Sequence, residues 1–225
     1  GDMPGDKIEI NQGHVEKAHA IFPVLLKAVA SKLKDGCKEK IVISVHGGSG
    51  VGKSETGALL AYYFNAMNLK AYVLSGDNYP YRIPQYNDAE RLRVFRTSGM
   101  AALVESQLLN REIKDTLLAL QKSDRDAEID LCQIHPWLRV YQRGGKKGLK
   151  LYLGTPTEID FQAINKIIRN FKDGKEAIML KRMGRSDSDL WYDSVDMKET
   201  KILIIEWTHG NNPNLHGVDV PILLN

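Results

Sequence analysis

One glycine-rich octapeptide constrains this chain more than any other feature of its sequence. Residues 47–54 read Gly-Gly-Ser-Gly-Val-Gly-Lys-Ser and fit the pattern G-x-x-x-x-G-K-[ST]. The β-branched run at residues 41–45 predicts a buried strand before it, and residues 53–67 predict a helix after it. A loop between a strand and a helix N-terminus can turn its N–H groups toward phosphate. The motif therefore predicts a nucleoside triphosphate site.

Every residue of this loop is a candidate ligand of the nucleotide. The set is Gly47, Gly48, Ser49, Gly50, Val51, Gly52, Lys53 and Ser54. We expect Lys53 to act in catalysis by neutralising the β- and γ-phosphates, and Ser54 to coordinate Mg²⁺. The cofactors that the motif predicts are ATP and Mg²⁺.

Two further strands are expected to bring carboxylates to the same site. Residues 71–74 predict a strand that forms a parallel pair with the first, and Asp77 follows it, 24 residues after Lys53. Ligands bind at the carboxyl edge of a parallel sheet, where a carboxylate can accept the proton of an attacking hydroxyl. Residues 201–206 predict a core strand that ends in Glu206, an acid placed to hold Mg²⁺ or its water.

The remaining periodicity predicts the fold class. Helices are expected at residues 14–33, interrupted by Pro23, at 88–120 and at 157–171. Residues 177–180 and 190–195 predict two strands around a polar turn, and residues 218–224 predict one more core strand. We predict an α/β fold of the P-loop NTPase type, with three α/β/α layers, a parallel core sheet, a helical insertion at about 83–156 and a small antiparallel hairpin.

Taken together, these residues resemble the phosphoribulokinase/uridine kinase family of P-loop kinases. The matches are the loop at 47–54, Gly76-Asp77-Asn78-Tyr79, Glu158-Ile159-Asp160-Phe161, the hairpin at 177–195, and Ile204-Ile205-Glu206. The resemblance implies that Asp77 is the catalytic base and that the hairpin helps to bind the acceptor. Trp207 departs from the family, which has glycine after the strand acid.

Two single motifs also resemble other kinases, and each keeps an alternative open. Gly76-Asp77-Asn78 is similar to the second-strand motif of adenylylsulfate kinases, which implies an adenylylsulfate kinase-like transferase. Glu55 stands where most such loops have threonine, and Gly52-Lys53-Ser54-Glu55 resembles HPr kinase/phosphorylase, which implies a kinase of a carrier-protein serine.

Four residues are candidates for holding the acceptor. Arg182 and Arg185 lie on the predicted hairpin and could grip an anionic group, although a solvated basic turn explains them as well. Tyr79 could stack on a base or sugar, with packing as the alternative, and Arg82 follows it. The basic segment at 139–150 contains two adjacent glycines and is expected to be a mobile loop.

Composition limits the classes of protein without naming one. A hydrophobic content of 43% and a charged content of 26% exclude collagen-like and disordered chains. A net charge of +3 demands no nucleic-acid or membrane partner, and none is expected. Two cysteines, Cys37 and Cys132, and the lack of a long apolar run are typical of a cytoplasmic protein.

The sequence thus predicts one domain over residues 1–225 that transfers the γ-phosphoryl group of ATP to a hydroxyl of a small metabolite, such as a nucleoside or a sugar phosphate. A third alternative is a nucleotide-binding module without transfer activity. The family's arginine-bearing lid and last strand have no counterpart after residue 224, so a shortened chain is expected. A homo-oligomer is left open.

Overall fold

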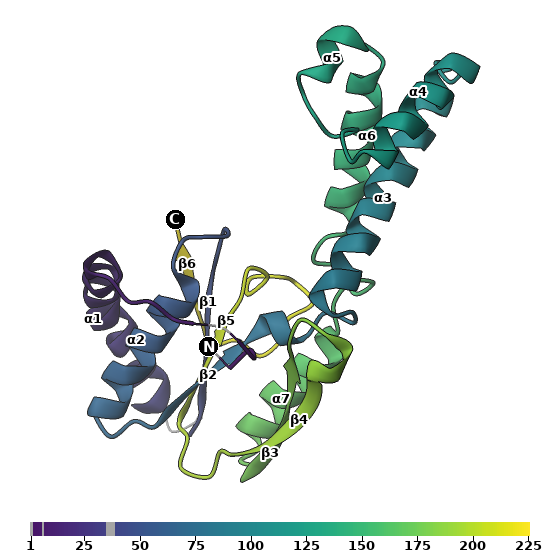
Figure 1. The fold of residues 1–225 in the computed structure, drawn as a ribbon. Helices are drawn as coiled ribbons and strands as arrows, with labels where there is room; N and C mark the ends of the chain where they lie inside the picture. Colours follow the sequence, from purple (N-terminus) through teal and green to yellow (C-terminus); the bar gives the residue numbers. More distant parts are fainter. Residues whose placement is uncertain (1, 6, 35–38) are drawn as a thin grey trace. The chain divides into compact units, whose positions relative to one another are not determined.

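The computed structural model describes residues 2–5, 7–34 and 39–225, which excludes Cys37 (Figure 1). The chain forms two compact units. The sheet unit comprises Gly1–Ile83 and Ile159–Asn225, and the helical unit comprises Pro84–Glu158, close to the insertion expected at 83–156. No helix in the described ranges is both long and apolar enough to span a membrane.

A four-stranded parallel sheet is the centre of the sheet unit. Its strands are β1 (Ile41–Gly47), β2 (Ala71–Ser75), β5 (Ile202–Glu206) and β6 (Val220–Leu224), in the order β2-β5-β1-β6. The expected parallel pairing of β1 with β2 is wrong, because β5 lies between them and pairs with both. All five residues of β5 are buried, and a strand that is apolar on both faces is most stable in the middle of a parallel sheet.

Helices cover both faces of this sheet. On one face, α1 (Gln12–Lys34) and α2 (Lys53–Ala66) pack through Leu25, Leu60 and Phe64. On the other face lies α7 (Phe161–Lys172), whose first turn is capped by Asp160, which accepts a hydrogen bond from the Ala163 N–H at 2.9 Å. The three-layer α/β arrangement is therefore present. Pro23 does not divide α1, which continues as one helix.

The predicted hairpin is also present, as β3 (Ala177–Met183) and β4 (Leu190–Asp196) in antiparallel register. It forms a separate two-stranded sheet, and the exposed turn between the strands includes the short 3₁₀ segment η2 (Asp187–Asp189). Ile178 and Leu180 of β3 are buried in the same hydrophobic cluster as α7. The hairpin thus packs on the α7 side of the sheet unit.

The helical unit contains α3 (Pro84–Glu105), α4 (Arg111–Lys122), α5 (Leu131–Ile134) and α6 (Leu138–Tyr152). The expectation of a mobile loop at 139–150 is wrong, since these residues form α6. Three glycines of α6 contact α3 so closely that a Cβ atom on any of them would collide with it: Gly144, Gly145 and Gly148. Close packing of two helices, rather than helix propensity, explains why a glycine-rich segment is helical here.

Candidate functional site

The glycine-rich loop at residues 47–52 connects the end of β1 to the start of α2, as the sequence predicts. Gly47 passes so close to the end of β6 that a Cβ atom would collide with the carbonyl oxygen of Leu224. Gly52 precedes the first turn of α2 with φ +84°, a left-handed conformation that other residues rarely adopt. The first N–H groups of a helix lack partners within the helix, so this turn presents donors and a positive dipole end.

Two lysines stabilise the loop through its carbonyl groups. The Lys53 Nζ atom donates to the Gly48 carbonyl at 2.7 Å, and the Lys17 Nζ atom of α1 donates to the Val51 carbonyl at 2.8 Å. The Lys53 ammonium therefore lies back over the loop that it follows. Ser49 and Gly50 at the tip of the loop are exposed.

Glu206 and Ser54 meet directly beneath the loop. The Ser54 hydroxyl, in the first turn of α2, donates to the Glu206 carboxylate with an Oγ–Oε2 distance of 3.0 Å. Glu206 ends the central strand β5, where its neighbours are Val45 on β1 and Ser75 on β2, and it is 3% exposed. Burial and the negative charge of Asp77 raise its pKa to about 7, against the opposing effect of the Ser75 and Ser54 hydroxyls.

Asp77 follows β2 in the 3₁₀ turn η1 (Gly76–Asn78), and it is exposed. Ser75, two residues before it, pairs with Glu206 across the sheet, so the two predicted carboxylates lie at the same edge of the sheet. Trp207, the departure from the family pattern, explains the glycine at 76: the buried indole lies where a Cβ atom would be. The Asn78 side chain accepts from the Met183 N–H at 2.9 Å, which connects this turn to the hairpin.

Arg182 is bound within the sheet unit by two carboxylates and a phenol. Its guanidinium donates to Asp2 at 2.6 Å, to Asp193 at 3.0 Å and to the Tyr72 hydroxyl at 2.9 Å, and the residue is 8% exposed. Asp2 also accepts from the Ser75 N–H at 2.7 Å, and burial raises its pKa. The sequence analysis missed Asp2 and Tyr72, and no local pattern could reveal a contact 180 residues apart.

The other candidate acceptor residues are less closely associated with the loop. Tyr79 is 1% exposed, and its hydroxyl has no hydrogen-bond partner among the described residues. It lines a hollow of about 440 Å³ between α7 and the hairpin, together with Lys181 and Tyr192. Arg185 lies on the exposed turn after β3, and Arg82 is half-buried just before α3. The structure therefore brings Ser54 into contact with Glu206 and places Asp77 in the turn after the neighbouring strand, while Lys53 contacts the glycine loop and Arg182 is bound by Asp2, Asp193 and Tyr72.

Comparison with known proteins relates the chain to kinases, once by sequence and once by structure. No family model matches the sequence. The bifunctional alpha-galactosidase/sucrose kinase AgaSK of Mediterraneibacter gnavus is 36% identical over 191 residues, which cover 84% of this chain but 16% of that protein. The chain thus corresponds to about one sixth of the length of that relative.

A crystal structure from Silicibacter sp. TM1040, of a protein assigned as a fructose transport system kinase, matches with a TM-score of 0.50 and 15% identity. The match covers 89% of this chain and 72% of that one, and at this identity it establishes a similar fold alone. Membership of the phosphoribulokinase/uridine kinase family stays a prediction.

Proposed function

We propose that the chain is an ATP- and Mg²⁺-dependent kinase of the P-loop type that phosphorylates a hydroxyl of a sugar. The observation that carries this proposal is the Ser54–Glu206 hydrogen bond beneath a glycine loop between strand and helix. A hydroxyl and a carboxylate in these positions are the protein ligands of Mg²⁺ in P-loop enzymes. The names of the two similar proteins, a sucrose kinase and a fructose transport system kinase, support a sugar as acceptor.

The loop residues fit the phosphates of ATP. The backbone N–H groups of residues 48–53 and the Lys53 ammonium would hold the phosphates, and the positive end of α2 would add to their attraction. Lys53 would exchange its contact with the Gly48 carbonyl for a phosphate oxygen. When bound, ATP supplies the γ-phosphoryl group, and the protein contributes position and charge.

The residues beneath the loop fit Mg²⁺. Glu206 is a buried carboxylate whose charge is opposed by Asp77, and a divalent cation would favour its ionised form. Among the described residues, no three histidine, cysteine or acidic side chains are placed to hold a metal ion together. This agrees with Mg²⁺ sites in kinases, where phosphate oxygens and water complete the coordination. Ser54 would bind the ion directly, and Glu206 directly or through water.

Asp77 is the proposed general base. It is exposed at the carboxyl edge of the sheet, in the turn that follows the strand next to that of Glu206, where an acceptor hydroxyl can reach it. Its turn is connected to β3 through Asn78, so an acceptor held by the hairpin would present its hydroxyl to Asp77. Asp77 would orient this hydroxyl and accept its proton as the phosphoryl group is transferred.

The surroundings of Arg182 favour an uncharged acceptor. The guanidinium is already balanced by the carboxylates of Asp2 and Asp193, so little positive charge is left for an anionic substrate. A neutral sugar needs no such charge, whereas an adenylylsulfate or a sugar phosphate would gain from it. This observation favours the sugar kinase over the adenylylsulfate kinase-like alternative.

An ADP-release assay with a panel of acceptors tests the proposal. We expect release with sucrose or fructose, and none above background with adenylylsulfate or ribulose 5-phosphate. Lys53→Ala should abolish transfer, and Asp77→Asn should lower kcat by about 10²- to 10⁴-fold, the usual contribution of a general base. Asp115→Asn, on the exposed face of α4, is the matched control and should leave kcat unchanged.

Other outcomes would replace the proposal. Near-normal kcat in Asp77→Asn would contradict the assignment of the base. ATP binding without ADP release for any acceptor would support a non-catalytic nucleotide-binding module. Transfer of labelled phosphate to a protein, with none to sugars, would support the carrier-protein serine kinase.

A further inference from the structure

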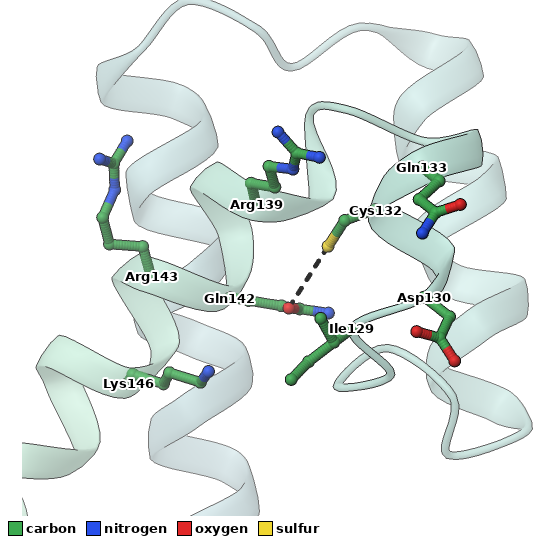
Figure 2. Close-up of a pocket in the computed structure, with 8 residues that line it drawn as sticks. All are labelled: Ile129, Asp130, Cys132, Gln133, Arg139, Gln142, Arg143 and Lys146. Atoms are coloured by element: carbon green, nitrogen blue, oxygen red, sulfur yellow. Dashed lines mark hydrogen bonds between the residues drawn. The ribbon is translucent and has the colours of Figure 1, made fainter.

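A second hollow, of about 440 Å³, lies entirely within the helical unit (Figure 2). Its walls include Ile129 and Cys132 on one side and Arg139, Gln142, Arg143 and Lys146 of α6 on the other. Figure 2 shows the three cationic side chains along α6, with Asp130 on the other side of the hollow. This hollow shares no residue with the glycine loop or with the two predicted carboxylates.

The three cations share one face of α6 because they are four and three residues apart. Gly144 and Gly148 lie on the opposite face of the helix and pack closely against α3. This contact prevents α6 from rotating about its axis. The arrangement of the helix therefore fixes the direction of the cationic face. The direction of this face follows from the close packing of α6 against α3.

These cations have no hydrogen-bond or ion-pair partner among the described residues. Other arginines of the helical unit are paired, including Arg96 with Asp124 and Asp126 and Arg91 with Glu158. Arg139 also lies in the first turn of α6, where the helix dipole disfavours positive charge. Like charges four residues apart on a helix repel each other. All three cationic side chains are exposed to solvent and line the hollow, so they remain available to an anion that enters it.

The neutral floor of the hollow is already organised. The Gln142 side chain donates to the Asp126 and Glu128 carbonyls at 3.2 and 2.9 Å, and it accepts from the Cys132 thiol at 3.5 Å. Gln142 and Cys132 are both about 5% exposed. Ile129, which is 70% exposed, adds an apolar wall. A ligand would therefore meet a preformed surface with cations along one side.

We propose that this hollow binds a small metabolite that carries two or more phosphoryl groups. From Arg139 to Lys146 the helix rises by about 10 Å, which separates the cations enough to bind two anionic groups at once. Arginine forks suit phosphate oxygens, and an open hollow of this volume is of the size that small molecules occupy. The proposal does not depend on the function of the glycine loop.

Calorimetric titration with inorganic pyrophosphate tests it, with the full chain carrying Lys53→Ala so that binding at the glycine loop is suppressed. We expect one site, whose Kd rises at least 10-fold when Arg139→Gln and Arg143→Gln are added. Lys147→Gln with Lys150→Gln is the matched control, since these lysines lie on the same helix, are exposed and do not line the hollow. In this control variant the Kd for pyrophosphate should change less than 2-fold.

Three results would overturn the proposal. Absence of pyrophosphate binding in the Lys53→Ala chain would exclude the site. An equal loss of affinity in both double variants would assign the attraction to the diffuse charge of α6, as for a nucleic acid or an acidic protein. An unchanged Kd in the arginine variant would place the ligand elsewhere. Equal thermal unfolding of the two double variants confirms that both are folded.

Discussion

Glu206 is an acid whose protonation depends on its place at the end of the central strand. Its pKa is raised from the usual 4.5 to about 7, so the folded chain binds this proton more tightly than the unfolded chain does. The stabilisation that this proton gives is complete below pH 4.5 and is lost as the pH rises through about 7. The free energy of unfolding should fall over this range by at most about 3 kcal/mol from this group.

Glu206→Gln should remove most of this pH dependence. The variant keeps the shape of the side chain but cannot ionise, so its Tm at pH 8 should exceed that of the original chain while the two agree near pH 4. Thermal unfolding between pH 4 and pH 8 measures this. An identical pH dependence in both chains would mean that the pKa of Glu206 is the same in the folded and the unfolded chain.

Sequence patterns predicted those residues of the candidate site that belong to a motif. Ser54 and Lys53 follow from the octapeptide, and Glu206 follows from its place at the end of an apolar strand. The sequence could not predict that Arg182 is balanced by Asp2 and Asp193, because the first contact joins residues 180 positions apart and the second depends on the hairpin register. Long-range electrostatics is set by the fold, and no local pattern encodes it.

At the scale of elements, the turn η1 depends on a close contact between Gly76 and Trp207. Gly76→Ala should be destabilising by about 1–3 kcal/mol, since its Cβ atom would collide with a buried indole that cannot move aside. The same change should displace Asp77 and lower kcat. Urea unfolding and the ADP-release assay measure the two effects. Gly13→Ala in α1 is the control, because its nearest neighbour would be 3.4 Å away, and a loss of stability as large as that of Gly76→Ala would contradict the argument.

The helix α6 shows where propensity fails as a guide. Glycines and charges predicted a loop, yet contact with α3 makes the segment helical. Gly144→Ala should therefore destabilise the chain by about 1–3 kcal/mol, although alanine is the better helix former by about 1 kcal/mol. The new Cβ atom would meet the Ala102 Cβ atom and the Ser98 carbonyl, neither of which can rotate away. A gain in stability on urea unfolding would show that α6 and α3 are less closely packed.

For the whole molecule, the alternation of strands and helices predicted the fold class but not the strand order. The βαβ pattern from β1 to β2 is consistent with adjacent strands or with strands that leave room for a third, and nothing between residues 41 and 75 distinguishes the two. The order was decided by β5, more than 120 residues later, whose apolar side chains are buried on both faces. Interior position is a property of the complete sheet, so it could not be predicted from one unit of it.

The helical unit has the features of an independently folding part. It has its own core, with Leu103, Leu117 and Leu138 fully buried, and its own buried polar network. In that network Asp126 accepts from Arg96 at 2.9 Å and from the Tyr141 hydroxyl at 2.6 Å. A domain needs a core of this kind to fold alone. We therefore expect residues 84–158, expressed separately, to be helical and to unfold cooperatively.

Circular dichroism with thermal and urea unfolding measures this expectation. Leu103→Ala should lower the stability of the isolated unit by about 2–5 kcal/mol, as expected for a large side chain removed from a core. Leu118→Ala, on the exposed side of α4, is the matched control and should change it by less than about 0.5 kcal/mol. If the isolated residues are unfolded, their core is completed by the rest of the chain. If the isolated unit unfolds cooperatively and only Leu103→Ala lowers its stability, these helices form a module that is stable on its own. Such a module can carry a binding site independently of the sheet unit.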